Sequence, residues 1–186
     1  TRQGERYAPY ARMREVAYDV AAAVHAAYQT IEWRDQVPLG AAFEEIDLAF
    51  RRPTPEQLQW AKDTLAKLEP DAKPKTLGEI YAARTMGVQS QPERARFALQ
   101  AFRIGDVGIT TFPNEVFSEI GLELKKRNPF KPSFTVSLAH GYFGYLPTPE
   151  QHALGGYETW LGTSRLEIEA SVKMIDQLLR MLESLK

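Results

Sequence analysis

The sequence contains no cysteine, which excludes disulfide bonds and zinc sites built on thiolates. No stretch approaches the ~20 consecutive apolar residues that a helix needs to cross a bilayer, so we expect no transmembrane segment. Neither sign of charge predominates. The net charge of −1 argues against the basic face that binding to nucleic acid requires. The motifs HExxH, GxSxG and a phosphate-binding glycine loop are also missing, so no generic catalytic motif identifies the chemistry.

The 186 residues are enough for one domain with a substantial core, and the composition is that of a globular protein. We see no repeat and no low-complexity linker, and therefore predict no internal boundary in residues 1–186. The opening segment TRQGERYAPY contains neither an initiator methionine nor the apolar core of a signal peptide. It is typical of the middle of a longer chain, and it leaves the localisation unknown.

Apolar residues three and four apart predict a first helix over residues 9–30. Capping boxes at Thr54 and Thr76 each predict the start of a further helix. A strand is expected over residues 43–50 and another over residues 133–138. Two β-rich runs flank Gly105-Asp106 and predict a hairpin with a type II′ turn. The last helix, over residues 166–185, is expected to bury an apolar stripe of Val172, Ile175, Leu178, Leu179 and Leu182. The predicted class is α/β, with a mixed β-sheet layer and flanking helices.

Two segments carry candidate functional residues. In PNEVFSEIGLELKKR, Asn114 is expected to cap a helix, with Glu115 in its first turn. An acid at that position more often compensates the helix dipole than performs chemistry. The segment LAHGYFGYLPTPEQHALGGYETW places Tyr142, Tyr145 and Tyr157 in a connector rich in glycine and proline. Such a connector is either a packed aromatic cluster or the wall of a site at the end of a strand.

The histidines give little further guidance. His140 lies inside the tyrosine-rich connector and is the only histidine that we consider a site candidate. His25 lies in an alanine-rich helical run, and His152 is expected to face solvent.

Together, LQAFRIGDVGITTFPNEVFSEIGLELKKRNPF and GYFGYLPTPEQHALGGYETW resemble the C-terminal half of the catalytic domain of the neutral/alkaline (non-lysosomal) ceramidase family, in its bacterial branch. The resemblance extends upstream through LGEIYAAR and EWRDQVPL. It implies a zinc-dependent amidohydrolase that cleaves the N-acyl bond of a ceramide-like lipid with metal-activated water.

The resemblance also implies roles for individual residues. Glu115 follows the proline of a PxE turn, and Tyr145 is the second tyrosine of a YxxY pair, so these two residues are the implied zinc ligands. Tyr157 is the implied catalytic donor to the oxyanion of the tetrahedral intermediate. His140 and Tyr142 are candidates for residues that contact and orient the ligands.

Two histidine ligands of the family lie N-terminal to the matched region, and none of the histidines here takes their place. We therefore expect this chain to be part of a larger, two-half catalytic domain whose partner is the missing N-terminal half. The isolated chain is not expected to be a competent hydrolase. The family suggests a secreted or periplasmic location. Two alternatives stay open: a non-catalytic domain that binds lipid or protein, and a structural domain in which the three tyrosines are core aromatics.

Overall fold

The computed structural model describes residues 7–186, which form two compact units that divide between Val37 and Pro38. The sequence did not indicate this division. The first unit contains the helix α1 (Ala11–Tyr28), within the predicted span, and no residue of α1 is buried. No helix within residues 7–186 combines the length and apolar character needed to cross a bilayer.

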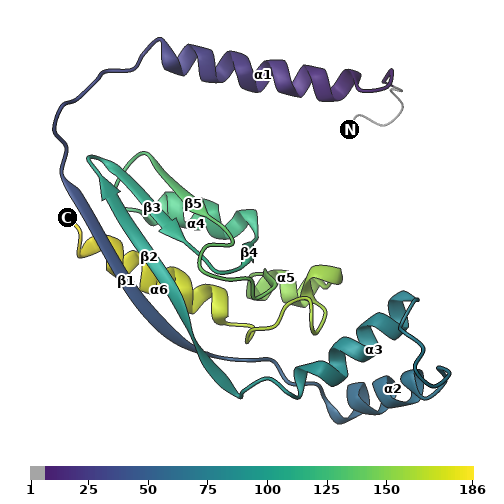
Figure 1. The fold of residues 1–186 in the computed structure, drawn as a ribbon. Helices are drawn as coiled ribbons and strands as arrows, with labels where there is room; N and C mark the ends of the chain where they lie inside the picture. The colour runs from purple at the N-terminus through teal and green to yellow at the C-terminus, as the bar shows by residue number, and fades with distance from the viewer. Residues whose placement is uncertain (1–6) are drawn as a thin grey trace. The chain divides into compact units, whose positions relative to one another are not determined.

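The second unit contains the sheets and the remaining helices (Figure 1). In chain order they are β1 (Leu39–Ala49), α2 (Pro55–Leu65), α3 (Leu77–Val88), β2 (Arg94–Ile104), β3 (Val107–Thr111), β4 (Glu115–Val116), α4 (Ser118–Arg127), β5 (Ser133–Val136), β6 (Tyr145–Leu146), α5 (Pro149–Leu154), the 3₁₀ helix η1 (Tyr157–Thr159) and α6 (Ala170–Glu183).

The main sheet has the strand order β1-β2-β3-β5. Its first two pairings are antiparallel and the pairing of β3 with β5 is parallel, so the predicted mixed sheet with flanking helices is confirmed. The β2–β3 hairpin closes on Gly105, whose positive φ of 61° suits the first central position of the predicted type II′ turn. Both predicted capping boxes, at Thr54 and Thr76, form.

One face of the main sheet packs on α6, and α4 packs on α6 and β5. Alternate residues of β1 and β2 point into this core, because successive side chains of a strand face opposite sides. The buried residues of this core include Leu48, Phe97, Leu99, Ala101, Ile120, Leu124, Met174, Leu178, Met181 and Leu182. The α6 stripe was predicted correctly except at its start. The helix begins at Ala170, and Val172 is exposed.

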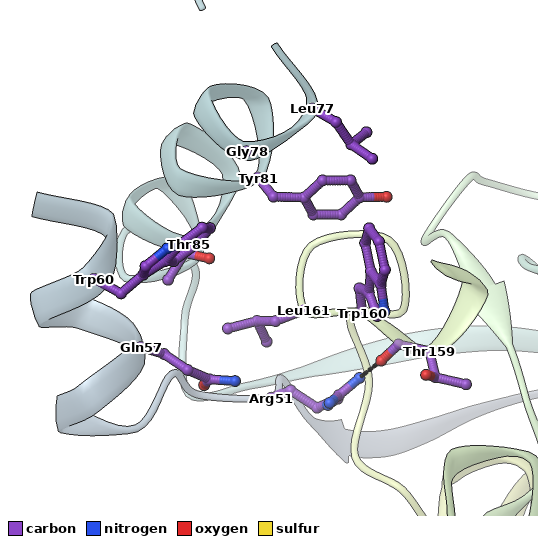
Figure 2. A pocket seen from close by; sticks show the side chains of 10 residues that line it. All are labelled: Arg51, Gln57, Trp60, Leu77, Gly78, Tyr81, Thr85, Thr159, Trp160 and Leu161. Carbon is purple, nitrogen blue, oxygen red and sulfur yellow. Dashed lines mark hydrogen bonds between the residues drawn. The ribbon is translucent and has the colours of Figure 1, made fainter. Parts of the chain in front are cut away.

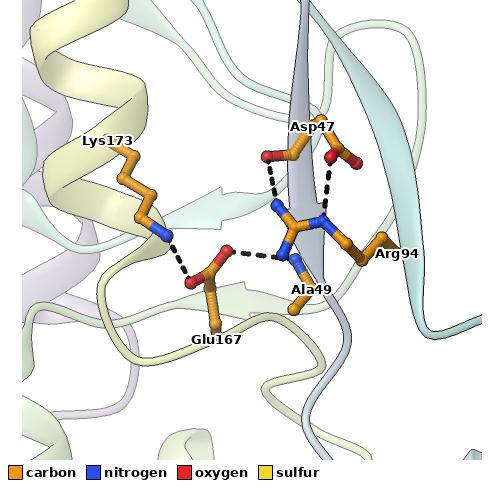
Figure 3. A network of polar contacts seen from close by, with 5 residues as sticks. All are labelled: Asp47, Ala49, Arg94, Glu167 and Lys173. Carbon is orange, nitrogen blue, oxygen red and sulfur yellow. Dashed lines mark hydrogen bonds and ion pairs between the residues drawn. The ribbon is translucent and has the colours of Figure 1, made fainter.

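The junction between β1 and α6 is held by a polar network (Figure 3). Glu167 accepts hydrogen bonds from the Ala49 amide (3.0 Å) and from Lys173 (2.5 Å). Burial by itself would raise the pKa of Glu167, but these two hydrogen bonds and the charges of Lys173 and Arg94 lower it. Arg94 also pairs with Asp47 across the β1–β2 ladder. The network ties the end of β1 to the segment that enters α6.

The opposite face of the sheet has apolar side chains exposed from three of its strands. The register places Phe43, Ile104, Phe134 and Val136 on this face, opposite the face that contacts α6. Phe134 and Val136 therefore share a side that is not buried within this unit, and the strand predicted over residues 133–138 ends at Val136.

Candidate functional site

The segment after Pro113 forms a short strand, and the prediction of a helix starting at Glu115 is wrong. Glu115 and Val116 make up β4, which pairs in parallel with β6, and α4 starts at Ser118 without a side-chain cap. The Glu115 amide donates to the Gly144 carbonyl (3.1 Å) and the Phe117 amide to the Leu146 carbonyl (3.4 Å). These bonds to a distant segment replace the expected cap at Asn114. They make Glu115 and Tyr145 direct partners in the β4–β6 register.

A buried asparagine and a glycine fix this register. Asn114 is fully buried, and its side-chain amide donates to the Gly144 carbonyl (3.2 Å). Gly144 has a φ of 79°, and a Cβ at this position would lie 2.1 Å from the Thr163 carbonyl oxygen. The Tyr145 amide donates to that same oxygen (3.0 Å). Only glycine fits between the two segments, so the backbone position of Tyr145 is tightly defined.

The Tyr145 and Tyr157 hydroxyls lie 3.0 Å apart and share a hydrogen bond. Their rings meet edge to face with centroids 5.8 Å apart. The hydrogen bond with Tyr157, followed by a hydrogen bond with Glu115, raises the pKa of Tyr145 above its ordinary value, and the negative charge of Glu115 adds to the effect. Glu115, Tyr145 and Tyr157 therefore form one polar cluster, named here the tyrosine–glutamate cluster.

Tyr157 reaches the cluster through the end of the connector. Thr148 caps α5 by accepting from the Gln151 amide (3.3 Å), and Gly155 and Gly156 then turn the chain with positive φ values. Tyr157 opens η1, and its side chain is 49% exposed. Tyr142 is 55% exposed, so neither tyrosine is a core aromatic, contrary to what a purely structural role would require.

The two residues expected to orient the zinc ligands have other partners. His140 shares a hydrogen bond with Gln100 on β2 (Nε2 to Oε1, 2.7 Å) and meets the edge of Phe43. Tyr142 lies under the guanidinium of Arg165, 5.7 Å from ring centroid to Cζ. These contacts tie His140 to the exposed sheet face and Tyr142 to the segment before α6.

Glu115 and Tyr145 offer two oxygen ligands of the kind that zinc accepts. A four-coordinate centre needs more ligands than these two. Among residues 7–186, no group of three or more histidine, cysteine, aspartate or glutamate side chains is placed to hold a metal ion. The cluster therefore offers two of the donors that a zinc site would need, and the described residues of this chain do not complete such a site.

A cavity of about 490 Å³ lies between the α2–α3 hairpin and the segment after η1 (Figure 2). It was not predicted, because its walls come from segments far apart in the sequence. Its lining is Arg51, Gln57, Trp60, Leu77, Gly78, Tyr81, Thr85, Thr159, Trp160 and Leu161. Among the residues that line it, only Trp160 lies in a segment that the sequence had singled out. It is the last residue of GGYETW, which also contains Tyr157.

His152 is half-buried, so the prediction that it faces solvent is wrong. Burial, followed by the positive charge of Arg51, lowers the pKa of His152 to about 4. The side chain is therefore neutral at neutral pH.

No protein-family model matches the chain, and no curated protein matches it in sequence. The fold, however, is that of solved ceramidase structures. Neutral ceramidase from Pseudomonas aeruginosa matches with a TM-score of 0.56 and 16% identity, over 99% of this chain and 34% of that chain. A ceramidase complexed with C2 matches with a TM-score of 0.55 and 14% identity, over 89% of this chain and 32% of that chain. The chain thus spans about a third of the length of the solved structures it matches, and the predicted likeness to part of a neutral ceramidase is confirmed for the fold.

Proposed function

We propose that this chain is part of a hydrolase that cleaves the N-acyl bond of a ceramide-like lipid, with the tyrosine–glutamate cluster in its active site. One observation carries the proposal. The parallel register places Glu115 beside Tyr145, and Tyr145 shares a hydrogen bond with Tyr157, in a fold similar to that of neutral ceramidase. These are the three residues whose roles the sequence resemblance implied.

Glu115 and Tyr145 would hold a zinc ion together with two histidines from outside this chain. A bound zinc ion would polarise the amide carbonyl and make water a strong nucleophile at neutral pH. The carboxylate and the phenol oxygen are hard donors, and the rigid backbone at Gly144 holds them side by side. Such fixed geometry limits the reorganisation that substrate binding requires.

Tyr157 would act on the substrate. Its hydroxyl is a hydrogen-bond donor, and it lies on an exposed side chain at the edge of the cluster. In the reaction it would donate to the carbonyl oxygen as that oxygen gains negative charge. One donor of this kind typically contributes about 3–4 kcal/mol to stabilisation of the transition state. The amine half of the lipid then leaves and the acyl half becomes a carboxylic acid.

The test measures zinc content and hydrolysis of a short-chain N-acyl sphingoid substrate in the complete protein that contains this chain. We expect about one zinc per chain in the wild type, and loss of both zinc and turnover in Glu115→Ala and Tyr145→Phe. Tyr142→Phe is the matched control, because Tyr142 lies nearby in the sequence but contacts Arg165. Full zinc occupancy and turnover in both Glu115→Ala and Tyr145→Phe would refute the proposal.

A further inference from the structure

We propose that the cavity between the α2–α3 hairpin and Trp160 binds the acyl chain of the substrate and the fatty acid that hydrolysis releases. The inference rests on the proposed function for the identity of the ligand. The existence and shape of the cavity do not depend on that function. Its volume of about 490 Å³ falls within the range of roughly 300–1,000 Å³ that is common for small-molecule sites.

The chemistry of the walls favours a hydrocarbon. Three aromatic rings, those of Trp60, Tyr81 and Trp160, face the cavity together with Leu77 and Leu161 (Figure 2). Tyr81 and Trp160 meet edge to face with centroids 4.8 Å apart and form one continuous wall. Burial of a chain against such a wall is favourable by about 0.8 kcal/mol per methylene group.

The two sides of the cavity are fastened to each other. The Tyr81 hydroxyl shares a hydrogen bond with the Thr163 hydroxyl (2.6 Å), and Arg84 donates to that same hydroxyl (3.2 Å). Gly162 has a φ of 87°, and a Cβ there would lie 2.9 Å from the Arg84 Cβ. This close approach lets α3 lie against the segment that carries Trp160. The cavity is therefore pre-formed in the absence of a ligand.

The cavity adjoins the tyrosine–glutamate cluster through η1. Tyr157 starts this 3₁₀ helix, and Thr159, at its other end, lines the cavity. A 3₁₀ helix rises about 2.0 Å per residue, so the two residues lie only about 4 Å apart along its axis. The proposal places the amide carbonyl of the lipid at Tyr157 and its acyl chain in the cavity on the far side of η1.

The charge of the cavity favours the released fatty acid over the released amine. Arg51 is the only charged residue in its lining. The Nη1 atom of Arg51 donates a hydrogen bond to the Thr159 carbonyl (2.6 Å). Burial lowers the pKa of Arg51, but an arginine stays protonated at neutral pH. A partly buried cation favours the carbonyl or carboxylate end of an acyl chain and repels the ammonium of a long-chain amine.

The test is a titration of the 186-residue chain, in which tryptophan fluorescence reports on the cavity. The sequence has three tryptophans, of which Trp60 and Trp160 line the cavity. The variant Trp33→Phe removes the third and serves as the background. The probes are hexanoate, octanoate and decanoate, with decylamine as the cationic counterpart, all below their micellar concentrations.

We expect saturable binding of the carboxylates that strengthens up to about fourfold per added methylene, and binding of decylamine at least tenfold weaker than that of decanoate. Leu77→Asp places a carboxylate in the cavity and should weaken decanoate binding at least tenfold. Leu77 is 60% exposed and opens α3, where an acid is favourable, so this variant should fold. Leu122→Asp on α4, also exposed, is the matched control and should bind like the background.

Three results would overturn the proposal: no saturable binding of decanoate, equal affinity for decanoate and decylamine, or equal weakening by Leu77→Asp and Leu122→Asp. The assay involves neither zinc nor turnover. If decanoate binds as expected but Glu115 and Tyr145 prove dispensable for zinc, the cavity stands as a fatty acid site and the proposed hydrolase fails. If zinc binding depends on both residues but decanoate does not bind, only the acyl site fails.

Discussion

Glu115 and Tyr145 are 30 residues apart in the sequence but are direct partners in the parallel pairing of β4 with β6. The pairing sets a carboxylate beside a phenol, and the hydrogen bond with Tyr157, followed by the one with this carboxylate, raises the pKa of that phenol. Both side chains are only partly buried, and the Tyr145 ring also meets the edges of the Phe117 and Tyr157 rings. Perturbed ionisable groups of this kind are common at functional sites, and the arrangement is consistent with the function that we propose.

Tyr157→Phe tests the role of the donor separately from that of the ligands. The substitution removes one hydroxyl that bonds to Tyr145 and leaves the ring contact in place. In the complete protein, we expect turnover to fall about 10²–10³-fold while zinc content stays near that of the wild type. Turnover and zinc are measured on the same preparation, with Tyr142→Phe as the control. Wild-type turnover in Tyr157→Phe would exclude Tyr157 as the oxyanion donor.

Gly144→Ala should destabilise the second unit severely. The new Cβ would lie 2.1 Å from the Thr163 carbonyl oxygen, and the backbone there has a φ of 79°. The two segments must separate to relieve this clash, which breaks the hydrogen bond from Tyr145 to Thr163. We expect a loss of about 3 kcal/mol or more in the free energy of unfolding, measured by urea denaturation.

Gly121→Ala is the control for that substitution. Gly121 lies in α4 with no atom within 4 Å of its Cβ position, so alanine should stabilise the helix by about 1 kcal/mol. If Gly144→Ala unfolds at the same urea concentration as the wild type, the close approach of Gly144 to Thr163 does not exist in solution.

Local signals in the sequence predicted most elements of the fold. The capping boxes at Thr54 and Thr76 and the Gly105 turn depend on neighbours within four residues, and all three were predicted correctly. The prediction failed where distant segments compete with local preference. Asn114 and Glu115 form a good helix start by themselves, but the Gly144 carbonyl accepts hydrogen bonds from both, and a strand results.

The candidate site likewise could be predicted only in part, because distant segments form it. The resemblance to a family supplied Glu115, Tyr145 and Tyr157, and the structure brings these residues together. The cavity beside Trp160 could not be predicted, because its walls are contributed by α2, α3 and the segment after η1. The spacing of residues within one segment cannot predict a cavity that three separate segments enclose.

Glu167→Ala should destabilise the junction between β1 and α6. Glu167 accepts a hydrogen bond from the Ala49 amide, which alanine at position 167 would leave without this acceptor. The expected loss is about 1–3 kcal/mol in the free energy of unfolding. Glu167→Gln is the matched variant. It keeps an acceptor for Ala49 and loses only the ion pair with Lys173, which is partly exposed and worth at most about 1 kcal/mol. Equal losses in the two variants would assign the effect to the ion pair.

His152 should make the stability of the second unit depend on pH. Its pKa is about 4 in the folded protein and about 6.5 in the unfolded chain, because burial and the charge of Arg51 disfavour the imidazolium. Between these values the unfolded chain binds more protons than the folded protein. The contribution of His152 to the free energy of unfolding is therefore fully present above about pH 6.5 and is lost as the pH drops toward about 4.

The measurement is the melting temperature of the chain across that interval for the wild type, His152→Gln and His25→Gln. Carboxylates titrate in the lower part of the interval in all three proteins. The difference in melting temperature between a variant and the wild type at each pH therefore isolates the contribution of the substituted histidine. His152→Gln should lose less of its melting temperature between about pH 6.5 and about pH 5 than the wild type, because glutamine takes up no proton. His25→Gln, at an exposed position on α1, should follow the wild type. If the melting temperature of His152→Gln varies with pH in parallel with that of the wild type, the prediction is wrong. The His152 imidazole would then be hydrated and would not interact with the charge of Arg51.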